Sequence, residues 1–76
     1  MTKKEIQLQP SHVKAYRFIE KYTKKNIVSP EVSEIAKGIG MSERQTYRAI
    51  DDLQELGFVS KVPYTPRSIK IVKPLT

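Results

Sequence analysis

The chain has 76 residues, a length that fits one domain with a small core and leaves no room for a deep, enclosed catalytic pocket. Its 14 Lys and Arg outnumber 8 Asp and Glu, giving a net charge of +6. This excess favours a polyanionic partner, because neutralising phosphates releases condensed counterions. The chain lacks cysteine, which excludes disulfides, thiolate metal sites and a cysteine nucleophile.

The single histidine, His12, cannot build a metal site alone, and we predict that it faces solvent in the first turn of a helix. The sequence also offers no glycine-rich phosphate loop and no Ser-His-Asp arrangement. We therefore expect no enzymatic activity, no cofactor and no metal. No apolar run approaches the roughly 20 residues that span a bilayer, and no signal peptide follows Lys3 and Lys4. A cytoplasmic, nucleoid-associated protein without membrane contact is expected.

Residues 1–7 are polar and lack periodicity, which predicts a flexible tail, with a basic arm touching DNA as the alternative. A first helix of about four turns should begin at Gln9 or Pro10, because proline suits the first helical turn. Its lysines and arginine are expected in solvent. The stripe predicted to face the core comprises Val13, Tyr16, Ile19 and Thr23, broadened by Ala15, Phe18 and Tyr22.

A second helix follows a short exit segment, in which Ile27 and Val28 are candidates for an extra strand. Ser29 is predicted to cap this helix, with Pro30 at its first position. The residues at helical spacing that should be buried are Val32, Ile35, Ala36 and Ile39.

A tight turn should join the second helix to a third. Gly40 is suited to end the second helix, since glycine adopts the left-handed conformation without steric penalty. Ser42 and Gln45 have the spacing of a capping box at the start of the next helix, and the small Ala36 lets the two helices approach closely. The third helix should end at Gly57 and bury Thr46, Ala49, Ile50, Leu53 and Leu56. Two short helices joined by a glycine turn are typical of a helix-turn-helix.

Two runs rich in β-branched residues follow, at residues 58–62 and 68–72, separated by a loop with two prolines. This pattern predicts a β-hairpin with a stiff loop. The whole is an α+β, mostly α fold: a winged helix-turn-helix over residues 8–73, with a short tail at 74–76.

The start of the third helix carries the side chains that suit base recognition in the major groove. Arg44 and Arg48 can each donate two hydrogen bonds to guanine, and Gln45 can pair with adenine unless the capping box holds it. Tyr47 can contact DNA or pack over the wing or the second helix. Asp51 and Asp52 would be repelled by phosphate, and Asp51 is placed to form an ion pair with Arg48. The residues expected to contact phosphate are Ser42, Lys61, Tyr64, Thr65, Arg67 and Lys70.

These features predict a sequence-specific regulator of transcription that binds double-stranded DNA. Winged helices also serve as protein-interaction modules, which would use Tyr47, Phe58 and Tyr64 as a contact surface. A domain for replication initiation or plasmid control would share the DNA chemistry.

The chain resembles the N-terminal winged-helix domain of the LexA repressor family from about Leu8 to Val72. The matching segments are the helix start at Leu8, Phe18-Ile19, Ser29-Pro30, residues 34–36 with Ile39-Gly40, residues 53–59 and residues 66–69. The resemblance implies a repressor domain whose third helix enters the major groove while the wing touches the backbone.

Two departures bear on that resemblance. The stretch from Gly40 to Leu53 is one residue shorter than in the LexA family, and the groove-facing residue types differ, so a LexA-type operator is not implied. No self-cleaving second domain follows Thr76, so we expect either an excised fragment or a small free-standing protein of phage or plasmid type. Because the missing domain supplies dimerisation in that family, the expected DNA-bound state is a monomer or a weak homodimer.

Overall fold

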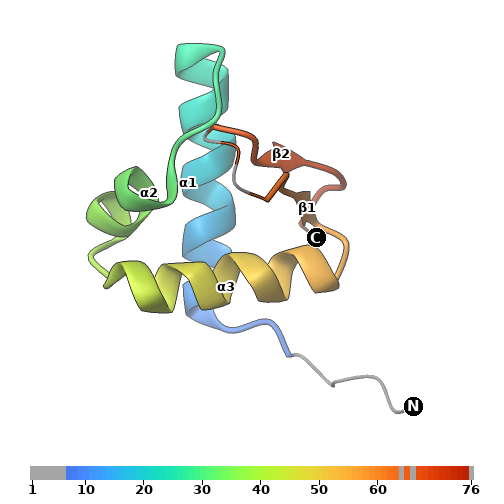
Figure 1. The fold of residues 1–76 in the computed structure, drawn as a ribbon. Helices are drawn as coiled ribbons and strands as arrows, with labels where there is room; N and C mark the ends of the chain where they lie inside the picture. The colour runs from blue at the N-terminus through green and yellow to red at the C-terminus, as the bar shows by residue number, and fades with distance from the viewer. Residues whose placement is uncertain (1–6, 64, 66, 76) are drawn as a thin grey trace.

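The computed structural model describes residues 7–63, 65 and 67–75. The helices are α1 (Pro10–Asn26), α2 (Val32–Ile39) and α3 (Glu43–Glu55), and the strands are β1 (Val59–Ser60) and β2 (Lys70–Ile71), as Figure 1 shows. Three helices followed by an antiparallel hairpin confirm the winged helix-turn-helix fold. The predicted tail lies outside the described residues except for Gln7. None of the described helices is long and apolar enough to cross a membrane.

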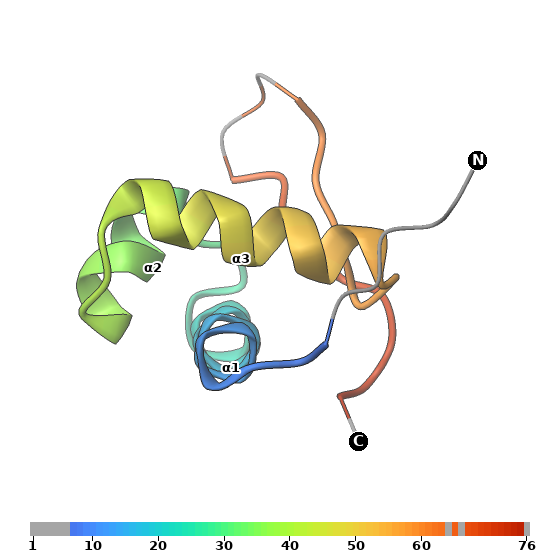
Figure 2. The same ribbon diagram turned by 90° about the horizontal axis from the view of Figure 1, so that it is seen from below.

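The core lies where the three helices meet beneath the hairpin. Figure 2, seen from below, shows α1 end-on beside α3, which runs across the view with α2 next to its first turns. Each helix contributes fully buried side chains, and the hairpin adds Val59 and Ile69. The helical residues at the centre of this core are Tyr16, Ile19, Ile35, Ile50 and Leu53. The helical spacing of apolar residues therefore predicted the centre of the core. Other residues expected there are only half-buried: Val13, Phe18, Tyr22, Thr23, Ile39 and Leu56.

The wing is a hairpin with shorter strands than the sequence predicted. Val59 pairs with Ile71 and Ser60 with Lys70, and the regular ladder extends no further among the described residues. Beyond it, the Val62 N–H donates to Ser68 Oγ (3.1 Å), and the same hydroxyl lies within hydrogen-bond distance of the carbonyls of Thr65 (2.8 Å) and Val62 (3.1 Å). A serine side chain thus replaces the backbone ladder at the base of the loop, which explains why the strands stop early.

His12 is buried, not solvent-facing, and the prediction for it was wrong. The side chain is only 5% exposed, and its Nδ1 accepts a hydrogen bond from the Gln9 N–H (3.0 Å). Because Nδ1 accepts, the neutral ring carries its proton on Nε2, which donates to Asp52 Oδ2 of α3 (3.0 Å). His12 therefore caps α1 and ties it to α3.

The segment between α1 and α2 also differs from expectation. Ile27 has φ 65°, caps α1 by donating its N–H to the Thr23 carbonyl (2.9 Å), and is 89% exposed. A left-handed residue cannot continue as a strand, so Ile27 and Val28 add none to the sheet. The helix after them starts later than predicted: Glu31, not Ser29, is the N-cap, and its N–H donates to Glu34 Oε1 (2.8 Å). Ser29 and Pro30 instead lie buried before the helix.

The C-terminal segment packs on the core beyond residue 73. The Tyr16 hydroxyl donates to the Lys73 carbonyl (3.0 Å), and the Lys73 ammonium lies 4.6 Å from the centre of the Phe58 ring. Leu75 packs against the core cluster. The folded part of the chain therefore includes residues that the sequence pattern assigned to a tail.

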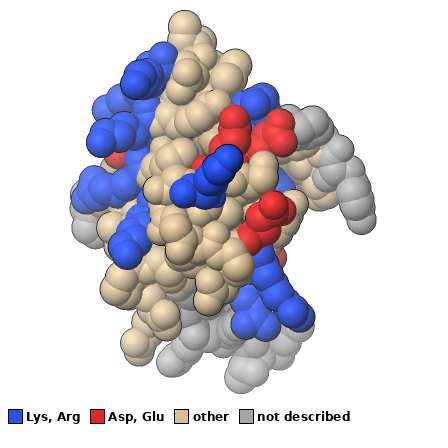
Figure 3. Space-filling view, turned by 90° about the vertical axis from the view of Figure 1, so that its left-hand side faces the viewer, with Lys and Arg blue, Asp and Glu red and all other residues tan. Residues whose placement is uncertain are grey.

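Charged side chains are distributed unevenly over the surface. Figure 3 shows Lys and Arg in a column down its left-hand edge, the side on which α1 lies, while Asp and Glu gather mainly in the other half. A second group of basic side chains is visible at the lower right of the same view. On the face shown, acidic and uncharged surface lies between these two groups, with further basic side chains near the middle and at the upper right.

Candidate nucleic-acid interface

The turn between α2 and α3 has the geometry that its glycine predicted. Gly40 has φ 70°, and the Met41 N–H donates to the Ala36 carbonyl (3.0 Å), closing the end of α2. Ala36 itself is buried. A left-handed glycine and a small buried alanine thus set the path by which the chain enters α3.

The capping box at the start of α3 is confirmed. The Gln45 N–H donates to Ser42 Oγ (3.1 Å), and Gln45 Oε1 lies 3.4 Å from the Ser42 backbone nitrogen. The Thr46 hydroxyl donates to the Ser42 carbonyl (2.8 Å), so the first turn of α3 is held by three local contacts. The oxygen of the Gln45 amide is therefore engaged at the helix start, whereas its side chain as a whole remains exposed.

Arg44 and Arg48 lie one turn apart on the exposed face of α3, opposite buried Thr46 and Ile50. The ion pairs found among the described residues join His12 to Asp52 and Arg67 to two glutamates, so neither of these arginines takes part in one. The predicted Arg48–Asp51 pair is therefore absent from that part of the chain. Two guanidinium groups stand clear at the start of α3, available to an external acceptor.

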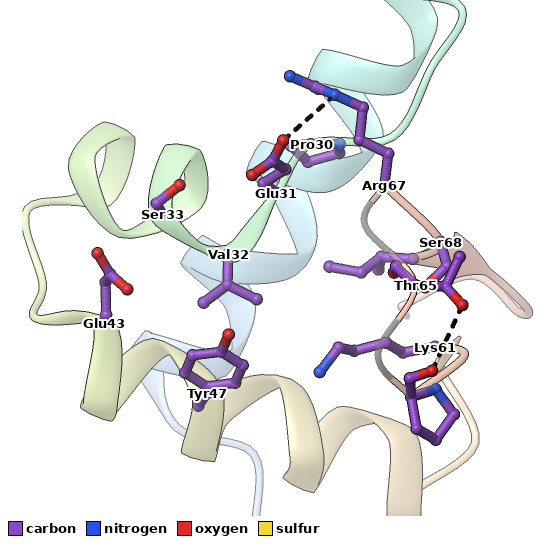
Figure 4. A pocket seen from close by; sticks show the side chains of 12 residues that line it. Pro30, Glu31, Val32, Ser33, Glu43, Tyr47, Lys61, Thr65, Arg67 and Ser68 are labelled. Atoms are coloured by element: carbon purple, nitrogen blue, oxygen red, sulfur yellow. Dashed lines mark hydrogen bonds and ion pairs between the residues drawn. The ribbon is translucent and has the colours of Figure 1, made fainter.

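Tyr47 lies between α3 and the wing. Its ring is 45% exposed and has the Lys61 ammonium 4.9 Å from its centre, within the range of a cation–π interaction. In Figure 4 the ring sits across a hollow from Val32, with the Lys61 side chain reaching toward it from the wing. This hollow has a volume of about 560 Å³ and is lined by residues of α2, α3 and the wing. Tyr47 thus contacts the wing through Lys61, while much of the residue stays exposed.

Arg67 does not project into solvent as the sequence suggested. Its backbone has φ 55°, and its guanidinium turns back onto α2. Nη1 donates to Glu34 Oε1 (3.0 Å), to the Ser29 carbonyl (3.2 Å) and to the Tyr22 hydroxyl (3.3 Å). Nε lies 3.5 Å from a carboxylate oxygen of Glu31, the contact drawn as a dashed line in Figure 4. This cluster fastens the wing to α2 and to the end of α1.

The same cluster affects the acidity of Glu34. A hydrogen bond from the Glu31 N–H, followed by those from Arg67 and Tyr22, holds the pKa of Glu34 below its ordinary value of 4.5. The carboxylate therefore stays ionised, and able to hold Arg67, well into mildly acidic conditions.

The other predicted phosphate contacts are placed as follows. Ser42, Thr65 and Lys70 are exposed, and Lys61 is half-buried because it lies over Tyr47. Tyr64 lies outside the described residues. Apart from Tyr64, the predicted base and phosphate contacts thus come from the start of α3 and the wing.

Sequence reasoning missed two residues that hold the elements of this site in place, His12 and Glu34. Each stands three residues after the N-cap of its helix, at the position from which a side chain reaches back to the cap N–H. That spacing was the available signal for both. Their long-range partners, Asp52 and Arg67, carry no such local signal.

A sequence model of a family described as a helix-turn-helix domain matches residues 7–59, which is more than half of the chain. This region includes all three helices and the first residue of β1. No curated protein matches the chain.

Proposed function

The chain belongs to the helix-turn-helix domain family, and from this premise we propose that it is a sequence-specific regulator of transcription acting on double-stranded DNA as a repressor. The family and the winged fold supply the DNA-binding architecture. The resemblance to LexA repressors favours repression as the outcome of binding. The proposal depends most on one observation, the exposed pair Arg44 and Arg48 at the start of α3.

In the proposed complex, the first two turns of α3 lie in the major groove. A guanidinium presents two parallel donors, which match O6 and N7 of guanine, and Arg44 and Arg48 are spaced so that both point outward from one face. Tyr47 lies at the edge of this face, beside the wing. Gln45 takes part through its amide N–H₂, because its oxygen is held at the cap. The contacts to base edges end near Arg48, because the exposed carboxylate of Asp51, three residues later, is repelled by phosphate.

The wing supplies contacts to the phosphate backbone. Lys61, Thr65 and Lys70 come from the two arms and the loop of the hairpin, with Tyr64 as a further candidate, and Ser42 adds a contact at the start of α3. Such contacts fix the register of α3 in the groove without reading sequence. We assign Arg67 a positioning role instead, because its guanidinium already has four protein acceptors, Glu31, Glu34, Ser29 and Tyr22.

Selection from a random pool of duplex DNA tests the proposal. Repeated rounds should enrich a short motif with guanines spaced for Arg44 and Arg48, and affinity for the selected duplex should fall steeply as salt is raised. A single asymmetric motif would indicate a monomer, and an inverted repeat a weak homodimer on DNA. Failure to bind any duplex at low salt would refute the proposal and favour a protein-interaction module.

A further inference from the structure

A second cationic surface lies on α1, on the side away from the core. Lys14, Arg17, Lys21 and Lys24 follow one another at intervals of three or four residues and are all exposed. This spacing places them on one face of the helix, opposite buried Ala15 and Ile19. Their side is the one along which Figure 3 shows basic side chains in a column.

Local helix stability does not account for these charges. Like charges at these spacings repel each other and destabilise a helix. The helix dipole favours Lys24 and Lys25 in the last turn, but it falls off within the terminal turns and so does not account for Lys14, Arg17 and Lys21. Within the described part of the chain, none of the four stripe residues takes part in an ion pair. One acidic residue, Glu20, stands four residues before Lys24, so the stripe keeps an excess of positive charge that an external anion can neutralise.

The stripe borders a shallow groove between α1 and α2 with an apolar floor. The groove has a volume of about 730 Å³, and its uncharged lining consists of Val13, Phe18, Gly38 and Ile39. Phe18 stacks on Tyr22 with ring centres 5.9 Å apart, and its ring lies so close to Gly38 that an added Cβ there would come within 2.0 Å of it. A glycine inside α2 thus keeps the aromatic floor in place. One acidic residue, Glu20, also lines the groove beside the four cations.

We propose that this groove between α1 and α2 docks an acidic amphipathic helix of a partner protein. Its carboxylates would pair with Lys14, Arg17, Lys21 and Lys24, and its apolar side chains would cover Val13, Phe18 and Ile39. A phosphate backbone would satisfy the charges but leave the apolar floor uncovered, so charge and floor together favour a protein segment. This surface lies on a different helix from the DNA-reading arginines, so the domain can hold its partner and DNA at the same time.

The test uses a synthetic peptide of about four helical turns, with Glu and Asp on one face and Leu and Phe on the other. Titrated into the isotopically labelled protein, it should shift the amide signals of Lys14, Arg17, Phe18, Lys21 and Gly38. The double variant K14E/K21E should weaken peptide binding by at least about tenfold, because it places like charges in contact. K14Q/K21Q should weaken it less, and circular dichroism verifies that both variants fold.

The matched control is R44E/R48E, which makes the same change in net charge on α3. It should leave peptide affinity within about twofold, whereas K14E/K21E should retain the preference for a selected duplex over a scrambled one. The peptide titration tests the docking proposal even when the protein binds no duplex. Three results would overturn it: no shifts in the groove, equal affinity for a peptide of the same charge with serine in place of Leu and Phe, or tighter binding of duplex DNA to these same amides.

Discussion

The first half of α3 carries two exposed arginines and begins at a local capping box, whereas the second half is acidic and tied to α1 by a hydrogen bond. Arg44 and Arg48 point outward from a turn stabilised by Ser42, while Asp52 pairs with buried His12 of α1. Both halves also bury side chains in the core, Thr46 in the first and Leu53 in the second. The side chains that we propose to read DNA are thus exposed, whereas the hydrogen bond that ties the helix to α1 lies nearer its other end.

The largest expected effect is on DNA recognition. Arg48→Ala should lower affinity for the selected duplex by about 10- to 100-fold, because a bidentate contact to guanine is worth roughly 1–3 kcal/mol. Affinity for a scrambled duplex should change far less, and the melting temperature should not fall. Fluorescence anisotropy with both duplexes measures the ratio. An equal loss on both duplexes would mean that Arg48 holds phosphate, and the division of α3 proposed here would be wrong.

Breaking the contact that ties the second half of α3 to α1 should lower stability and leave DNA recognition unchanged. His12→Ala should destabilise the fold by about 1–3 kcal/mol, since it leaves Asp52 and the Gln9 N–H without their hydrogen-bond partner. Urea unfolding gives this value. The preference for the selected duplex over the scrambled one should stay unchanged under conditions where the variant is folded. Unaltered stability would show that the contact between α1 and α3 contributes nothing.

The cap of α3 should have a smaller effect on stability. Ser42→Ala removes the acceptor of the Gln45 N–H and should cost about 1 kcal/mol, the usual value of an N-cap. Ser33→Ala is the matched control, because Ser33 is exposed within α2. Ser42→Ala should therefore unfold at a lower temperature than Ser33→Ala. Identical unfolding curves would mean that the cap does not stabilise α3.

The pH dependence of the wing anchor follows from Glu34. Its pKa is lower in the folded protein than in the unfolded chain, so its contribution to stability is complete above the ordinary value of 4.5 and is lost as the pH falls through the folded pKa. Glu34→Gln should therefore flatten the decline in stability below that pH. Unfolding curves at a series of acidic pH values compare the two proteins, and parallel declines would argue against the anchor.

The smallest expected effect is on DNA affinity, when a negative charge beside Arg48 is removed. Asp51→Asn removes a carboxylate next to Arg48 and should raise DNA affinity by about twofold to fivefold at low salt, because phosphate repulsion falls. Glu20→Gln makes the same change in net charge on α1 and should have a weaker effect. Equal gains from both variants would mean that only net charge matters.

Sequence alone determined the parts of this protein that depend on local chemistry. The apolar spacing of Ile50 and Leu53, the left-handed Gly40 and the capping pair Ser42 and Gln45 act within one or two helical turns, so neighbouring residues were enough to predict them. The exposed placement of Arg44 and Arg48 followed from the same spacing.

Tertiary structure decided what depends on residues far apart in the chain. The burial of His12 requires Asp52, 40 residues away, and the inward turn of Arg67 requires Glu34, 33 residues away. The late start of α2 is different, because the hydrogen bond from the Glu31 N–H to Glu34 that caps it spans only three residues. A polar side chain such as that of His12 or Arg67 has several possible partners in the sequence, and only the packing of the helices brings one of them within hydrogen-bond distance.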